Sequence, residues 1–268
     1  MLYKVKAIVL GGKDIGEADK IITLYSEERG KIRAVAKGVR KIKSKFGSSL
    51  ETFTLSSLLV YSKNDPFRQV RLHRSSGKNS LDIISDTQIQ DSFRNLRGNL
   101  AGFAYGNFLV ELVNRMTGEG EIGGHRTFCL LRDFLSLGVG QKNIRVLIYA
   151  FTFRLFNILG YYPQVEKCVE CNRTVKRGSG FKFSVNRGGV LCNNCKNGET
   201  GTLPVSASSV QYFKQLLKME SRYLKNLRVP LNCGKELENI VQGYLDFYLE
   251  RNMESLVFLK NVTTDFTD

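Results

Sequence analysis

The sequence predicts an α+β protein of several domains, in which a small N-terminal β-barrel precedes an α-helical domain that carries an inserted four-cysteine ribbon. Three observations support this architecture. Short segments with β-type alternation fill residues 1–76, apolar residues at helical spacing begin near residue 80, and two Cys-x2-Cys pairs interrupt the helical part. A chain of 268 residues is long enough to form several such domains.

The N-terminal segments predict short antiparallel strands separated by glycine-rich turns. In residues 31–37, for example, charged side chains occupy one face of the strand and small apolar side chains the other. Five short strands within 80 residues favour an OB-fold barrel in residues 1–78, with an SH3-like barrel as the alternative. The strands are expected at residues 4–10, 20–25, 31–37, 53–61 and 67–73.

Helical periodicity predicts five helices, and the one at residues 144–159 is apolar almost all round, as a buried helix would be. The others are expected at residues 92–116, 127–137, 207–219 and 236–250. The helical domain is therefore expected in two parts, residues 79–164 and 204–260, on either side of a ribbon at residues 165–203. Residues 261–268 are expected to form a frayed polar tail.

Four of the six cysteines have the spacing of a metal site. Two Cys-x2-Cys pairs, separated by 20 residues, supply the four thiolates that Zn²⁺ binds as a tetrahedron. All four positions would be sulfur, which leaves no open site for a substrate, so one structural Zn²⁺ ion is expected. Two disulfides, or cysteines that are merely buried, are the alternatives. A reducing cytoplasm disfavours the disulfides, and the repeated spacing disfavours a chance arrangement. The predicted ligands are Cys168, Cys171, Cys192 and Cys195, whereas Cys129 and Cys233 are expected to be packed thiols.

The charge distribution favours a polyanionic partner. The chain carries 40 Lys and Arg against 25 Asp and Glu, a net charge of +15, and residues 1–80 hold two thirds of this excess. No acidic residue lies between Glu28 and Glu51. A solvated charge run is the alternative reading, but solvated surfaces usually mix both signs. Sequence-tolerant, salt-dependent binding to nucleic acid is expected at Arg33, Lys37, Arg40, Lys41, Lys43 and Lys45.

Three aromatic residues near this segment, Tyr25, Phe46 and Tyr61, are candidates for stacking on bases, although aromatics on barrel strands more often belong to the core. The chain contains no P-loop, no dinucleotide-binding glycine motif and no Gly-x-Ser-x-Gly, and its two histidines, His73 and His125, are expected to be structural. A non-enzymatic protein is therefore expected. With neither a signal peptide nor a long apolar segment, a cytoplasmic location is expected.

Several segments closely resemble the bacterial recombination mediator family RecO. They are residues 17–24, residues 30–40 with Ser44 and residues 50–53, residues 155–163, and the ribbon residues 181–184 and 188–192. The resemblance implies an OB-fold, a helical domain and, in members that keep the cysteines, a zinc ribbon that serves stability. It also implies that the basic residues of the OB domain contact DNA.

The resemblance further implies a role in the RecF pathway of DNA repair, in the nucleoid. The protein would bind single- and double-stranded DNA and anneal strands coated with single-strand-binding protein, whose C-terminal tail is one partner. With RecR it would assist loading of the RecA recombinase. A zinc-ribbon transcription or RNA-binding factor is the rival interpretation, and it would show sequence preference or ribosome association.

Overall fold

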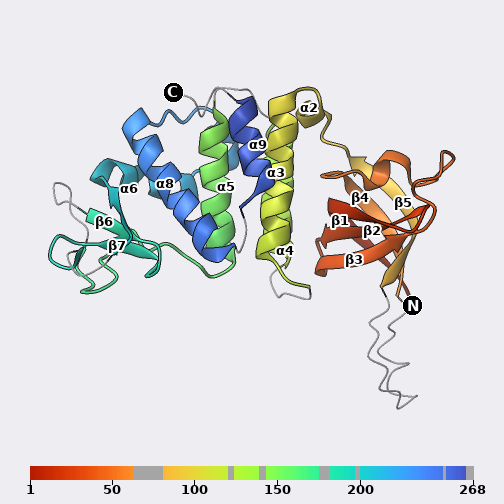
Figure 1. The fold of residues 1–268 in the computed structure, drawn as a ribbon, viewed down its shortest axis with the longest axis horizontal. Helices are drawn as coiled ribbons and strands as arrows, with labels where there is room; N and C mark the ends of the chain where they lie inside the picture. The colour runs from red at the N-terminus through yellow and green to blue at the C-terminus, as the bar shows by residue number, and fades with distance from the viewer. Residues whose placement is uncertain are drawn as a thin grey trace, which may run out of the picture. The chain divides into compact units, whose positions relative to one another are not determined.

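The computed structural model describes residues 1–62, 81–119, 124–138, 143–174, 181–196, 200–249 and 252–263 (Figure 1). The chain forms two compact units, Met1–Gly138 and Val139–Asp268. The first unit contains the barrel and the helices that follow it. The second contains the remaining helices and the ribbon.

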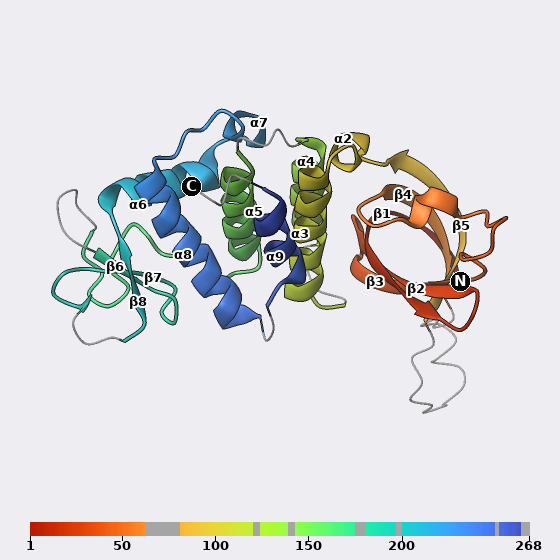
Figure 2. The same ribbon diagram turned by 45° about the horizontal axis from the view of Figure 1, so that its top comes forward.

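The first unit is built on a closed five-stranded barrel, which confirms the predicted fold class (Figure 2). Neighbouring strands pair in the order β1-β2-β3-β5-β4, and β4 closes the ring by pairing with β1. All pairs are antiparallel except β3 with β5. The strands are β1 (Leu2–Ile15), β2 (Asp19–Ser26), β3 (Gly30–Ala36), β4 (Leu55–Tyr61) and β5 (Asp82–Asp91).

The barrel interior is filled by the inward-facing side chains of its strands. On β1, Val5 and Ala7 are buried and alternate with Lys4 and Lys6, which gives the period of two of a half-buried strand. From Ala7 to Leu10 every residue is buried, so this alternation does not continue. Leu24 and Leu58, from β2 and β4, are fully buried in the same core. A closed barrel leaves no free strand edges, so this core is continuous.

The fifth strand of the barrel lies later in the chain than the predicted strands. The expected strand at residues 67–73 lies outside the described residues, and β5, at Asp82–Asp91, is the strand that pairs with both β4 and β3. The barrel therefore extends past the predicted boundary at residue 78. Only Ile84 on β5 is buried, so the strand lacks the apolar alternation by which strands are recognised in a sequence. Backbone pairing with its neighbours defines it instead.

Among its described residues, the first unit has three helices after the barrel, and a 3-10 turn, η1 (Gly47–Leu50), lies between β3 and β4. The helix predicted at residues 92–116 is divided in two because Asn99 caps a new helix: its side-chain oxygen accepts a hydrogen bond of 2.6 Å from the backbone N–H of Gly102. Gly106 allows α3 to pack closely on Phe53, since a Cβ atom at this position would lie 3.2 Å from the Phe53 ring. These helices are α2 (Arg94–Arg97), α3 (Leu100–Met116) and α4 (Gly124–Ser136).

The second unit contains five helices among its described residues: α5 (Ile144–Ile158), α6 (Ala207–Lys218), α7 (Ser221–Leu224), α8 (Leu231–Tyr248) and α9 (Glu254–Val262). Helix α5 is buried along nearly its whole length, as predicted. Helix α8 begins directly after Pro230, five residues before the predicted start. Helix α9 was not predicted, and it extends to Val262 through buried Leu256 and Leu259, so the expected frayed tail is ordered at its beginning. Residues 264–268 lie outside the described part.

The ribbon lies between α5 and α6 in the chain and forms a three-stranded sheet in the order β7-β6-β8. Strands β6 (Phe181–Ser184) and β7 (Gly189–Leu191) form an antiparallel hairpin in which Phe181 and Phe183 are buried. The strand β8 (Thr202–Val205) adds a third strand that the sequence pattern did not show, and it ends two residues beyond the predicted ribbon boundary. Among the described residues, no helix is both long and apolar enough to span a membrane.

Candidate metal centre and nucleic-acid interface

Each Cys-x2-Cys pair lies on a tight turn whose backbone hydrogen bonds are local. In the first turn, the N–H of Asn172 donates to the carbonyl of Cys168 over 2.9 Å, and Asn172 adopts a left-handed conformation with φ of 60° that asparagine tolerates well. In the second turn, the N–H groups of Cys195 and Lys196 both donate to the carbonyl of Cys192 over 3.0 Å. Both thiols of a pair can therefore face one ion.

Backbone pairing around Gly189 brings the two turns together. The N–H of Val190 donates to the carbonyl of Gln164 over 2.9 Å, and the N–H of Val169 donates to the carbonyl of Val190 over 3.0 Å. A Cβ atom at Gly189 would lie 2.5 Å from the Gln164 carbonyl oxygen and from a methyl group of Val169. Only glycine allows the first cysteine turn to approach β7 this closely.

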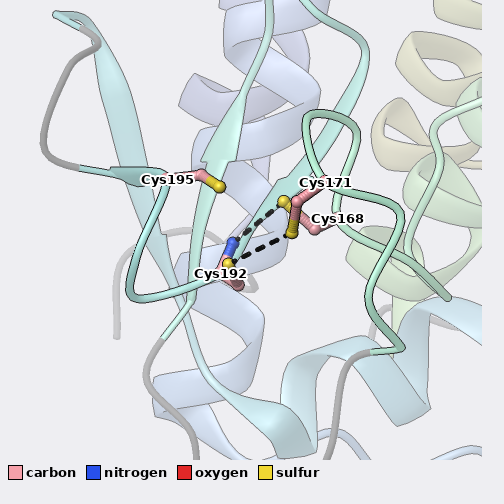
Figure 3. A group of neighbouring side chains, drawn as sticks. All are labelled: Cys168, Cys171, Cys192 and Cys195. Carbon is pink, nitrogen blue, oxygen red and sulfur yellow. Dashed lines mark hydrogen bonds between the residues drawn. The ribbon is translucent and has the colours of Figure 1, made fainter.

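The four sulfur atoms converge on one point between the turns (Figure 3). All lie within 4.8 Å of one another, and the Sγ atoms of Cys171 and Cys192 are 3.7 Å apart. Four sulfurs at about 2.3 Å from a central Zn²⁺ would be separated by about 3.8 Å. A disulfide would require a separation of about 2.05 Å, and all four cysteines are free thiols. The geometry therefore fits a tetrahedral metal site better than it fits two disulfides.

The thiol pKa values show that this cluster is suited to a cation. Burial raises the pKa of Cys168, but the backbone N–H groups of Cys171 and Cys192 outweigh this effect and lower it to about 7. The hydrogen bond that the Cys195 thiol donates to Cys192, followed by burial and the other nearby sulfurs, raises the pKa of Cys195 to about 12. Four thiolates cannot coexist at this separation without a positive charge between them, and a bound metal ion supplies that charge.

The other two cysteines differ from each other. Cys233 is buried in α8, as expected of a packed thiol. Cys129 is only half-buried, and its sulfur lies 3.5 Å from Nε2 of His125. Nδ1 of the same histidine lies 3.4 Å from the Glu27 carboxylate. Cys129 therefore belongs to a small surface cluster, and the expectation that it is simply packed is wrong.

Four of the predicted DNA-binding residues lie in the turn that follows β3, namely Lys37, Arg40, Lys41 and Lys43. The turn is held by its backbone: the N–H of Gly38 donates to the Asp19 carboxylate over 2.7 Å, and the N–H of Arg40 donates to the Ala18 carbonyl over 3.0 Å. Lys37, Lys41 and Lys43 are exposed, and no ion pair links them to any acidic group in the described part of the chain. Their charges therefore remain available to a partner.

Arg40 of this turn and the two remaining predicted residues, Arg33 and Lys45, contact protein groups. Arg33 on β3 forms an ion pair with Glu119, Arg40 lies 3.4 Å from Asp14, and Lys45 donates to the carbonyl of Ser85. The sequence window contains no acid, but the fold brings acids from other segments to it. Exposed ion pairs contribute only about 0–1 kcal/mol to stability, so a phosphate can replace these carboxylates.

The three predicted stacking candidates are mostly unavailable. Tyr25 and Phe46 are buried in the first unit, so their rings are part of its core, whereas Tyr61 is partly exposed. A different ring, Phe103 on α3, is 40% exposed. Phe103 has the helical spacing of the apolar residues around it, such as Leu96 and Leu100, and no sequence signal distinguishes it from the buried ones. The turn also carries Ile42, whose side chain is fully exposed between two lysines.

The fold and these sites define the chain as a multidomain OB-fold protein with a cationic barrel loop and a ribbon whose four cysteines could hold a metal ion. Two family models match it: Recombination protein O N terminal over residues 1–66 and Recombination protein O C terminal over residues 97–256. The chain therefore belongs to the Recombination protein O family, a family of DNA repair and recombination proteins.

Relatives match along almost the whole chain. The DNA repair protein RecO of Pelotomaculum thermopropionicum is 34% identical over 258 residues, which cover 96% of this chain and 93% of the relative. The protein of the same name from Symbiobacterium thermophilum is 30% identical, with 96% of each chain covered. That of a Thermoanaerobacter species is also 30% identical and covers 97% of this chain and 98% of the relative.

Proposed function

We propose that this protein is a recombination mediator of the RecF pathway that binds single- and double-stranded DNA through the turn after β3. The observation that carries the proposal is the set of three exposed lysines, Lys37, Lys41 and Lys43, which have no acidic partner among the described residues. Phosphate contacts by such side chains release counterions, so the binding is sequence-tolerant and weakens as salt increases.

The same electrostatics supports strand annealing. Lysines on one turn neutralise phosphates of two complementary strands at once, which lowers the repulsion between the strands and leaves their bases free to pair. In this role the protein acts on strands coated with single-strand-binding protein, whose C-terminal tail it contacts. With RecR it assists the loading of RecA, and these steps require no nucleotide hydrolysis by this chain.

The metal ion of the proposed protein is one structural Zn²⁺, held by Cys168, Cys171, Cys192 and Cys195. Four thiolates in a tetrahedron are a donor set typical of structural zinc, and they leave no coordination position for a substrate. The ion joins the two cysteine turns and thereby stabilises the ribbon. DNA binding by the barrel does not depend on it directly.

An annealing assay tests the proposed function. Complementary oligonucleotides coated with single-strand-binding protein are mixed with the full-length protein, with and without RecR, and duplex formation is followed by energy transfer between dyes. Faster annealing on strands of unrelated sequence supports the proposal. Strong preference for one sequence, or no acceleration with either strand pair, contradicts it and favours a transcription or RNA-binding factor.

A further inference from the structure

A cleft in the first unit adjoins the lysine-bearing turn. It lies between the barrel, the η1 turn and helices α2 and α3, and its volume is about 440 Å³. Arg40 belongs both to the turn and to the cleft wall. A DNA strand held by the turn therefore places its neighbouring nucleotides at the mouth of this cleft. Small-molecule sites in proteins typically have volumes of about 300–1,000 Å³, so the space is adequate for one nucleoside.

The cleft combines an apolar lining with one exposed aromatic ring. Ile22 and Leu50 contribute buried side chains to the lining, and the ring of Phe103 is 40% exposed. The Phe103 ring is fixed edge-on against Phe53, with ring centroids 5.6 Å apart. An exposed ring held in one orientation is suited to stack on a flat aromatic ligand, because little conformational entropy is lost when the ligand binds.

Arg97 makes one wall of the cleft rigid. Its guanidinium donates hydrogen bonds to the carbonyl of Thr52 over 2.7 Å and to the carbonyl of Ser92 over 2.9 Å. The same group lies 3.3 Å from the Glu51 carboxylate and 4.3 Å from the centre of the Phe53 ring. Arg97 thus already has protein acceptors. Its role is therefore to stabilise the wall of the cleft and not to bind a ligand.

The other two cations at the cleft form only long, exposed ion pairs with the protein. Lys20 and Arg40 share a single carboxylate, Asp14, at 3.5 and 3.4 Å. All three side chains are substantially exposed. One carboxylate for two cations leaves a net positive charge, so a phosphate next to a base in the cleft would be attracted there.

We propose that this cleft receives one unstacked nucleobase of a bound single strand, with Phe103 as the stacking surface and Lys20 and Arg40 beside the adjoining phosphate. The inference rests on the proposed function, since the strand is delivered by the lysine-bearing turn. A free mononucleotide is a poorer occupant because the rigid cation, Arg97, is already satisfied by the protein. A base attached to a strand that the lysines hold benefits from a high local concentration.

The test compares two oligonucleotides of the same length and charge, oligo-dT and an abasic oligonucleotide that keeps only the sugar-phosphate chain. Both are titrated against the full-length protein by fluorescence anisotropy. Stacking of one base predicts that Phe103→Ala weakens oligo-dT binding about tenfold and leaves binding of the abasic oligonucleotide unchanged. Phe103→Trp should retain the wild-type preference for oligo-dT. Phe258→Ala is the matched control, because Phe258 is a helical phenylalanine with the same 40% exposure.

The outcomes separate this inference from the proposed function. Equal binding of both oligonucleotides by the wild type, or an equal loss on both in Phe103→Ala, overturns the base cleft but leaves DNA binding intact. If the wild type binds neither oligonucleotide at low salt, the proposed function itself fails.

A second measurement needs no variant. Irradiation of the wild-type complex with an oligonucleotide that contains 5-iodouracil, followed by peptide mass spectrometry, should give an adduct on the peptide that contains Phe103. Adducts found only on other peptides contradict the inference.

Discussion

Removing the three unpaired lysines should change how the DNA affinity of this protein responds to salt. In the triple variant Lys37→Gln, Lys41→Gln and Lys43→Gln, the backbone bonds that hold the turn are retained, since they use the N–H groups of Gly38 and Arg40. The fold should therefore be unaffected, and only the phosphate contacts are lost.

The size of the effect follows from counterion release. Each phosphate contact on a single strand contributes about 0.7 to the slope of log affinity against log salt concentration. Three contacts contribute about 2. Between 50 and 200 mM salt, the affinity of the wild type should therefore fall about 20-fold more than that of the variant. Fluorescence anisotropy with a single-stranded oligonucleotide at four or five salt concentrations measures both slopes.

The control is a second triple variant with the same change in net charge, Lys218→Gln, Lys225→Gln and Lys235→Gln. These lysines are exposed in the second unit. Their removal should leave the slope close to that of the wild type. An unchanged slope in the first variant, or an equal reduction in both, would refute the assignment of the binding site to the turn after β3.

Three further predictions concern stability and the metal. Cys168→Ser should lose the metal ion. If the free zinc concentration is about a thousandfold above the Kd, the loss costs about 4 kcal/mol of stability, which corresponds to a fall of about 10 °C in Tm. Metal analysis with a melting curve checks this, and a zinc-free variant of unchanged Tm would contradict it. Gly189→Ala should weaken zinc binding in a chelator titration and lower the free energy of unfolding by about 1–3 kcal/mol, because the added methyl group forces the first cysteine turn away from β7. Gly234→Ala is the control: a Cβ atom there meets open space within a helix, so this variant should keep its zinc affinity and be as stable as the wild type or more so. Tyr3 donates to the Asp82 carboxylate over 2.6 Å, and burial followed by this hydrogen bond raises its pKa well above 10; the neutral phenol therefore stabilises the fold below about pH 10, and the contribution is lost at higher pH. Tyr3→Phe should lower the free energy of unfolding by about 1 kcal/mol at pH 8, with a smaller difference at pH 11, and a difference that is constant with pH in urea titrations would count against it.

Local patterns determined much of this protein from the sequence alone. Cysteines separated by two residues lie on the same turn, alternation marks the inward face of the first half of β1, and a mostly apolar stretch defines α5. Each of these features depends on residues within a few positions of one another, so spacing and periodicity are enough to predict it. The resemblance to the RecO family was also visible in such short segments, and the family models agree with it.

Only the tertiary structure decided how these local pieces are used. Strand β5 has little apolar alternation and is defined by its pairing with β3 and β4. The segment between Glu28 and Glu51 contains no acid, but the fold brings Glu119, 86 residues away in the chain, into contact with Arg33. Contacts of this kind distinguish the cations that already have a protein partner from the three lysines that are available to DNA. Phe103 looked like any core residue of its helix, yet it lines an open cleft. The physical reason is common to all three cases: solvent exposure and ion pairing are set by groups distant in the chain, and no local spacing encodes them.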